Sequence, residues 1–530
     1  MAENIVQIRS LPGIKRDGTR FEGDQYVDGQ WVRFQRGLPR KIGGYRSVNK
    51  YLSSVARTLH GYTLDLLTYI HAGSANVLER LFIDGSLNTS IISDRTPSTL
   101  VQSSANLWQF DVDTAGGSGL QLLAQVAPNL NCICNSDGGQ LFYGDEFGTA
   151  PLTEITNFPS PYSVTGGVVA LHPYTVAFGN DGFVMWSVPG DPTDYTGSGA
   201  GNAYVTGQKI VRGMPLRGGP GNSPSGLLWS ADSLLRMTYV GGTPVFQFDT
   251  ISAQSSILSA QSVIEYDGIF YWIGTDRFLS FNGVVREIEN NLNLNFFFDN
   301  LNYAQRQKVF AMKVPRFGEI WWCFPKGDSI EPNHAVIYNV RENNWYDTAL
   351  PNGGRAAGLF PAIFRKPLMS GVLPTFLPEV TRITEAGDTR ITEESNDPQY
   401  RLWVHEVGTD EVDGLIINPI LSYFETADLS LPVQSQTNRA LQVLLMEPDF
   451  VQSGDMTVQA KGRANARAPE VDGEVKTIVE TPQTPQEQVI YFKEQRRELR
   501  FRFTSNTVGG NYEMGLILAH VQPGDATVIG

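Results

Sequence analysis

The sequence predicts an all-β protein, a β-propeller of six or seven blades with an inserted arm and a C-terminal β-sandwich-like domain. Glycine (53 residues) and proline (30 residues) are abundant, and aromatic residues make up 11%, which is typical of a turn-rich β protein. Apolar residues alternate in short runs separated by Asp-Gly and Asn-Gly, the strongest hairpin signals in a sequence. These runs recur in groups of four, as in a propeller. No WD, kelch or aspartate-box motif recurs, so a chain of β-sandwiches stays the alternative.

The first 53 residues form an irregular leader. A strand is expected at Trp31–Phe34, and turns at Gly37–Pro39 and Gly43–Gly44. Such a leader can close a propeller by adding a strand to the last blade. Equally, it can reach a neighbouring subunit by strand addition.

Residues 54–414 are expected to form the propeller. Its first three units are predicted at about 57–92, 107–156 and 167–196, the third ending in the short strand DPTDYT, and the fourth begins at Gln208. The fifth and sixth occupy Ser262–Tyr346, and mixed apolar spacing between them predicts a short helix near Leu292–Leu301. A seventh begins near Arg355 and ends near 407.

An insertion is predicted inside the seventh unit, at about 372–399. The pentapeptide TRITE occurs twice in it, at Thr381–Glu385 and Thr389–Glu393. This composition suits a solvated hairpin with its turn at Ala386–Asp388. A low-complexity surface loop is the alternative.

Residues 415–530 are predicted to form a separate β domain. About seven strand candidates fall in this segment, and Leu499, Phe501 and Phe503 alternate with Arg500 and Arg502. That density and alternation fit a sandwich.

The charge balance argues against a protein that wraps DNA. The chain has 41 Lys and Arg against 55 Asp and Glu, a net charge of −14, whereas phosphate contacts need cations. An acidic protein past which DNA slides is not excluded. Residues 1–50 are basic (ten Lys/Arg, five Asp/Glu) and residues 371–420 are acidic (three against ten).

The motifs that would indicate an enzyme are incomplete, so no catalytic, cofactor or metal residues are predicted. The glycine-rich run at 218–226 lacks the lysine of a P-loop. His405-Glu406 begins like a zinc-protease motif, but Thr409 stands where the second histidine belongs. A calcium-loop beginning at Asp111 has Leu122 in place of the required glutamate.

The cysteines and histidines add no further site. Cys132, Cys134 and Cys323 are expected to be reduced, as in a protein made in a reducing cytoplasm, and the N-terminus lacks the layout of an export signal. Six histidines are scattered over different units, although distant residues can converge in a propeller.

Three segments, Asp28–Tyr45, Leu301–Tyr346 and Leu499–Asp525, resemble the tail hub or nozzle proteins of short-tailed (podovirus-type) phages, also called packaged-DNA stabilisation proteins. The resemblance implies a virion tail protein, made in the host cytoplasm, without enzymatic activity, cofactor or membrane insertion. It implies a ring, as a hexamer, below the head-to-tail adaptor. Such a ring extends the DNA channel, lets double-stranded DNA pass without sequence-specific binding, retains packaged DNA and supports fibres or spikes. The alternative is a propeller enzyme or lectin that acts on cell-surface glycan through Trp and Tyr platforms.

Two groups of residues are predicted to serve this function. Arg33, Arg36, Arg40 and Lys41 should meet a neighbouring subunit or the adaptor, unless they simply face solvent. Four acids of the insertion are expected to line or gate the DNA channel, because carboxylates repel the DNA backbone; otherwise the insertion is a docking arm for a fibre. These acids are Glu385, Asp388, Glu393 and Glu394.

Overall fold

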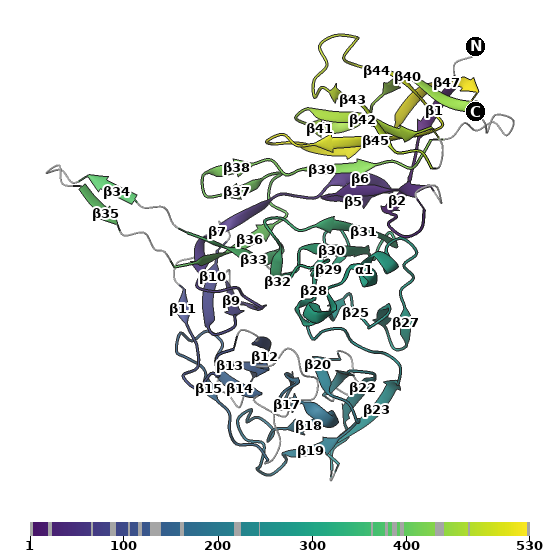
Figure 1. The fold of residues 1–530 in the computed structure, drawn as a ribbon. Coiled ribbons are helices and arrows are strands. Elements are labelled where there is room, and N and C mark those ends of the chain that lie inside the picture. Colours follow the sequence, from purple (N-terminus) through teal and green to yellow (C-terminus); the bar gives the residue numbers. More distant parts are fainter. Residues whose placement is uncertain are drawn as a thin grey trace.

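The computed structural model is a β protein with a seven-bladed propeller below and β-sheets above it (Figure 1). It describes residues 4–19, 24–64, 67–84, 92–103, 106–114, 119–127, 139–159, 164–216, 224–242, 244–361, 364–376, 380–383, 389–392, 397–429, 439–464 and 467–526. Within these residues the one α-helix is α1 (Leu294–Asn300), which lies between the fifth and sixth blades, as predicted. No helix among them is long and apolar enough to cross a membrane.

The first six blades are four-stranded antiparallel sheets whose strands follow one another in chain order. Blade 1 consists of β8 (Thr58–Leu64), β9 (Leu67–Gly73), β10 (Leu78–Ile83) and β11 (Ser93–Asp94). Blade 2 consists of β12 (Leu107–Thr114), β13 (Leu120–Ala127), β14 (Gln140–Asp145) and β15 (Thr153–Glu154). Blade 3 consists of β16 (Gly167–Leu171), β17 (Tyr174–Phe178), β18 (Phe183–Trp186) and β19 (Gly201–Tyr204). Blade 4 consists of β20 (Ile210–Pro215), β21 (Ser225–Ser230), β22 (Leu234–Tyr239) and β23 (Phe246–Ser252). Blade 5 consists of β24 (Ile264–Tyr266), β25 (Ile269–Ile273), β26 (Phe278–Phe281) and β27 (Val285–Glu287). Blade 6 consists of β28 (Phe310–Val314), β29 (Glu319–Phe324), β30 (His334–Asn339) and β31 (Asn344–Ala349).

The seventh blade combines the two ends of the propeller segment. It contains β32 (Arg355–Leu359), β33 (Leu368–Thr375), β36 (Gln399–His405) and, from the leader, β7 (Tyr45–Leu52). β7 pairs antiparallel with β36, and β32 contacts β8 of blade 1, which closes the ring. The propeller prediction is confirmed, with seven blades.

Local turn chemistry explains why the hairpins form where they do. Tyr266 pairs with Ile269, and the two residues between them, Asp267 and Gly268, have φ of 52° and 78°. Positive φ at both central positions matches the right-handed twist of the flanking strands. Adjacent blades then pack through aromatic side chains; Trp229 and Trp272 meet edge to face at 5.8 Å, and both are 0% exposed.

Two outer strands differ from the prediction. The expected strand DPTDYT in the third unit is a turn, because Asp191 and Asp194 accept hydrogen bonds from the backbone N–H groups of Thr193 and Thr196. The outer strand of that blade is β19 instead. In blade 1 the outer strand is β11, just beyond the predicted stretch, most of which lies outside the described residues.

The sheets above the propeller are built from both ends of the chain. Besides β7, the leader contributes β1 (Asn4–Ile8), β2 (Leu11–Ile14), β3 (Gln25–Tyr26), β4 (Asp28–Gln30), β5 (Val32–Gln35) and β6 (Leu38–Lys41). The C-terminal part contributes β37 (Glu411–Asp413), β38 (Ile416–Asn418), β39 (Ser422–Glu425), β40 (Arg439–Glu447), β41 (Phe450–Ser453), β42 (Met456–Arg463), β43 (Val471–Ile478), β44 (Ile490–Arg496), β45 (Glu498–Ser505), β46 (Asn511–Met514) and β47 (Ile517–Ala526).

The three larger sheets have the orders β1-β47-β40-β44, β4-β39-β45-β42-β43 and β41-β46-β6-β5. Each therefore includes at least one leader strand, so residues 415–530 alone do not complete them. A single apolar core continues from these sheets through Trp31 of the leader to Trp321 of blade 6, whose rings lie 6.1 Å apart. The leader thus joins the two parts of the molecule.

Candidate functional site

A hairpin arm stands away from blade 7 (Figure 1). β34 (Val380–Ile383) and β35 (Thr389–Thr392) form an antiparallel sheet of their own, in which Thr381 pairs with Ile391 and Ile383 with Thr389. The prediction that the TRITE repeat forms a hairpin is confirmed. The insertion is slightly shorter than predicted, because β33 continues to Thr375 and β36 begins at Gln399.

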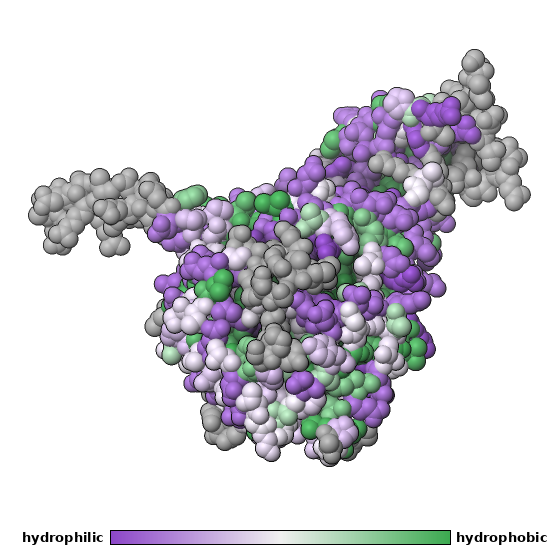
Figure 2. Space-filling view, turned by 60° about the horizontal axis from the view of Figure 1, so that its bottom comes forward, coloured by the Kyte–Doolittle hydropathy of each residue, from purple (hydrophilic) through white to green (hydrophobic). Residues whose placement is uncertain are grey.

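The four acids assigned to the channel lie outside the described residues: Glu385, Asp388, Glu393 and Glu394. What the structure does describe is the base of the arm, where Leu373 and Phe376 are 56% and 60% exposed. Figure 2 shows hydrophobic surface where the arm meets the body. The arm therefore leaves the propeller beside exposed apolar side chains.

A second exposed hairpin lies on the same blade. β37 pairs in parallel with β7, and β38 completes the edge of the sheet. Its apolar residues Leu415, Ile416 and Ile417 are 101%, 62% and 52% exposed. Contiguous exposed apolar residues on a sheet edge are characteristic of interaction surfaces.

Two of the four basic leader residues point into the molecule. The side chain of Arg33 is 1% exposed and lies between the carboxylates of Glu319 (Nε–Oε1, 2.8 Å) and Glu406 (Nη1–Oε2, 3.0 Å). Lys41 is 3% exposed and donates a hydrogen bond to the carbonyl of Gly510 at 2.7 Å. Buried cations with partners in their own chain cannot also contact a neighbouring subunit, which corrects the expectation for these two residues.

The other two basic residues remain accessible. Arg36 is in the two-residue turn between β5 and β6, where Glu342 accepts its backbone N–H at 2.7 Å, and its side chain is 74% exposed. Arg40 is 30% exposed and pairs with Glu513. Arg316, which is exposed, precedes Phe317 in the sequence. The guanidinium groups of Arg40 and Arg316 both lie over the ring of Phe317. These three arginines form the basic turn.

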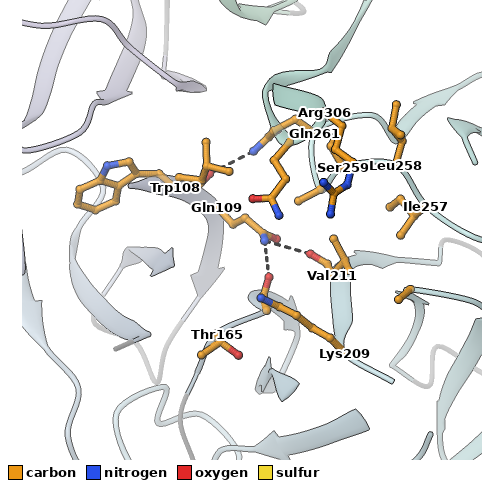
Figure 3. A pocket seen from close by; sticks show the side chains of 15 residues that line it. Trp108, Gln109, Thr165, Lys209, Val211, Ile257, Leu258, Ser259, Gln261 and Arg306 are labelled. Carbon is orange, nitrogen blue, oxygen red and sulfur yellow. Dashed lines mark hydrogen bonds between the residues drawn. The ribbon is translucent and has the colours of Figure 1, made fainter. Parts of the chain in front are cut away.

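The propeller axis contains a small pocket (Figure 3) of about 100 Å³, lined by both apolar and polar residues. The residues that line it lie where the innermost strands of several blades begin. The side chains of Gln109 and Gln261 connect those strands through hydrogen bonds. Gln109 donates to the carbonyls of Gly166 in blade 3 and Val211 in blade 4, and Gln261 donates to the carbonyl of Trp108 in blade 2. The volume is that of about three water molecules.

This pocket excludes one route for DNA. A duplex whose major groove alone is about 12 Å wide cannot pass through an axis that amide side chains bridge. Lys209 and Arg306 are also among its lining residues, and its volume suits water or a small ion.

Two of the three incomplete motifs have structural contacts, whereas most of the glycine-rich run at 218–226 lies outside the described residues. His405 is 4% exposed and accepts a hydrogen bond from Nε of Arg355 at 3.2 Å, and burial holds its pKa well below the ordinary value. Asp111 accepts the backbone N–H of Ala170 in the next blade at 2.8 Å, which ties blades 2 and 3 together. Cys323 is buried, which raises the pKa of its thiol, whereas Cys132 and Cys134 lie outside the described residues.

Sequence reasoning missed one side-chain cluster. His60 and His71 lie opposite each other on β8 and β9, and Glu146, which follows β14, meets them from the next blade. The separation along the chain gave no signal for this convergence. The nine tryptophans, in contrast, are all buried, the most exposed being Trp186 at 7%.

Comparisons with known proteins add little to this picture. No family model matches the chain, and no curated protein matches it. Two solved structures show a distant likeness: the computationally designed Ika8 protein (11% identity, 68% of this chain and 99% of that one, TM-score 0.35) and the WD40 β-propeller domain of Doa1 (12% identity, 68% and 97%, TM-score 0.37). The propeller assignment rests on the strand order and the closure of the ring.

Proposed function

We propose that this protein is a non-enzymatic structural subunit of a short-tailed phage tail, a hub or nozzle protein. It assembles as a hexameric ring below the head-to-tail adaptor, extends the DNA channel, retains packaged DNA and supports fibres or spikes. Support for the identity comes from the three resembling segments, Asp28–Tyr45, Leu301–Tyr346 and Leu499–Asp525.

The observation that supports assembly into a ring is the isolated arm. A two-stranded hairpin by itself is marginally stable in water, and the sheet of β34 and β35 has only these two strands. A partner on which it packs would stabilise it. The exposed Leu373 and Phe376 at its base offer apolar area for this contact, and Leu415 to Ile417, at the far edge of the same sheet, offer a second apolar area.

The channel of such a ring lies between subunits. The bridged propeller axis has no room for a duplex, so a lumen has to be enclosed by several copies. A net charge of −14 suits a wall past which DNA slides, because fixed carboxylates repel phosphates over the screening length of about 8–10 Å.

Of the aromatic platforms that glycan binding would use, the tryptophans are excluded, whereas Tyr204, Tyr303 and Tyr491 are 60%, 55% and 59% exposed. An aromatic platform for a sugar must be accessible on one face, and no tryptophan is more than 7% exposed. The proposed ring needs no such platform.

Removing the arm is expected to abolish the ring. Replacing residues 377–397 by a short Gly-Ser linker should leave monomers, measured by light scattering after gel filtration, while the propeller keeps its unfolding temperature. Shortening the exposed turn at 481–488 is the matched control and should leave the ring intact. A ring that persists without the arm contradicts this assignment.

The basic turn is the second proposed contact, to a neighbouring subunit or the adaptor. Removing residues 1–25 is not a clean test of it, because that deletion takes β1 and β2 from their own sheets. Exchanging Arg36 and Arg40 for alanine tests it with the same gel-filtration measurement and with an adaptor-binding assay.

Charge reversal in the arm distinguishes lumen from docking site. Changing Glu385, Asp388, Glu393 and Glu394 to lysine in assembled particles should slow DNA ejection or cause leakage if the arm lines the channel, because lysines bind phosphates. Ejection kinetics can be followed with a DNA-binding dye. Normal ejection together with lost fibres would assign the arm to fibre docking instead.

A further inference from the structure

Two histidines and a glutamate, residue types that serve as transition-metal ligands, meet between blades 1 and 2. His60 on β8 and His71 on β9 are directly paired, so both project from the same face of the sheet. Glu146 follows β14 of blade 2, and its backbone N–H is held by the carbonyl of Leu120 at 3.0 Å. The side chains of His71 and Glu146 are 0% exposed, and that of His60 is 18% exposed.

The polar atoms that face one another in this cluster have no hydrogen-bond partners. They are Nε2 of His60, Nδ1 of His71 and both carboxylate oxygens of Glu146. Leaving a carboxylate buried without a partner is costly, so such a group calls for a cation or a donor.

The spacing of these atoms suits a metal ion better than hydrogen bonds. Oε1 of Glu146 lies 3.5 Å from Nε2 of His60 and 3.7 Å from Nδ1 of His71, beyond the hydrogen-bond range of about 2.7–3.2 Å. Ligands of a tetrahedral ion with bonds of about 2.0–2.1 Å are about 3.3 Å apart. All three ligand atoms lie within 4.8 Å of one another, so a small rearrangement of the side chains would bring them to this spacing.

We propose that His60, His71 and Glu146 bind a divalent transition-metal ion of the Zn²⁺ class. Two imidazoles and one carboxylate are a ligand set that Zn²⁺ accepts, with a fourth position for water on the accessible side of His60. The ion clamps blade 1 to blade 2, because the histidines belong to the first blade and the glutamate to the second.

Metal binding by His71 requires Arg95 to give up the hydrogen bond that it makes to this histidine. Its Nη1 donates to Nε2 of His71 at 2.9 Å, so the neutral ring holds its proton on Nδ1 when no metal is bound. Metal binding moves that proton to Nε2, and Nη1 must turn to the carbonyl of Glu146, which is 3.5 Å away. Burial, aided by His60, Arg95 and Arg80, lowers the pKa of His71.

The test uses the full-length chain, stripped with a chelator and then equilibrated with ZnCl₂. We expect one Zn²⁺ per chain after desalting, measured by mass spectrometry of the metal, and a higher unfolding temperature than in the stripped protein. Co²⁺ in place of Zn²⁺ should give the visible absorption of a tetrahedral site. This readout needs no ring and no phage particle, so it is independent of the proposed function.

Ligand variants decide the assignment. His60→Gln and Glu146→Gln should each weaken Zn²⁺ binding at least about tenfold and remove the shift in unfolding temperature. His172→Gln is the control, because His172 is a 60% exposed histidine in another blade. Wild-type protein that keeps no Zn²⁺, or a folded His60→Gln variant that binds it as well as the wild type, overturns the proposal.

Discussion

Replacing Arg33 by methionine is expected to lower the free energy of unfolding by about 3–5 kcal/mol, the usual cost of breaking a buried ion pair. Arg33 joins the leader to two blades through Glu319, which is 0% exposed, and Glu406. Burial alone would lower the pKa of Arg33, but the two carboxylates raise it above its ordinary value. Methionine keeps the apolar stem and leaves both carboxylates without their cation.

Glu319 cannot compensate through its other contacts. It already accepts hydrogen bonds from Nε1 of Trp321 at 2.8 Å and from the hydroxyl of Tyr346 at 2.7 Å, and burial raises its pKa in spite of Arg33. Without the guanidinium the group has to bind a proton or expose itself to water. Either change costs free energy and weakens the contact between leader and propeller.

Urea unfolding followed by tryptophan fluorescence measures this effect, because Trp31 and Trp321 are at the affected contact. The double variant Arg33→Met with Glu319→Gln should be less destabilised than Arg33→Met alone, since it removes one of the two unpaired charges. Arg277→Met is the surface control; Arg277 and Asp276 form an exposed pair that contributes about 1 kcal/mol or less. A loss below about 1 kcal/mol for Arg33→Met would show that the buried pair is dispensable.

Acid is expected to weaken the other contact between leader and propeller, at Asp347. This carboxylate is 0% exposed and accepts hydrogen bonds from Nε of Arg16 at 2.9 Å and from Nε2 of His334 at 2.9 Å. Burial would raise its pKa, but Arg16 and His334 lower it from 3.8 to about 2. A shift of this size corresponds to about 2.5 kcal/mol of stability.

The direction of the pH dependence follows from the sign of that shift. A carboxyl group whose pKa is lower in the folded state stabilises the protein fully above about pH 4. That stability is lost as the pH falls from about 4 to about 2. The pKa of His334 is also lowered, chiefly by burial, so its protonation destabilises the protein in acid as well.

Asp347→Asn should be less stable than the wild type at pH 7 by about 2–3 kcal/mol and should show a flatter dependence on pH between 4 and 2. Thermal unfolding at a series of pH values measures both. Asp276→Asn, an exposed site, is the matched control. Equal acid sensitivity in Asp347→Asn and the wild type would assign the dependence to other groups.

The sequence by itself determined the features that depend on near neighbours. Alternation with an Asp-Gly turn specifies the hairpin around Asp267, and the repeated TRITE specifies the arm, because pleat period and turn geometry act over a few residues. The same local rules failed at DPTDYT, where side-chain bonds from Asp191 and Asp194 to nearby backbone N–H groups outweigh the alternating pattern.

Only the tertiary structure decided where distant segments meet. Basic composition could not distinguish Arg33, which is buried against two blades, from Arg36, which is 74% exposed. The spacing of residues in the sequence also did not predict that Glu146 meets His60 and His71. Nor did it predict that the leader is divided between the last blade and the upper sheets. These outcomes depend on which strand edges and carboxylates become neighbours after folding, and that information lies in contacts between residues that are far apart in the sequence.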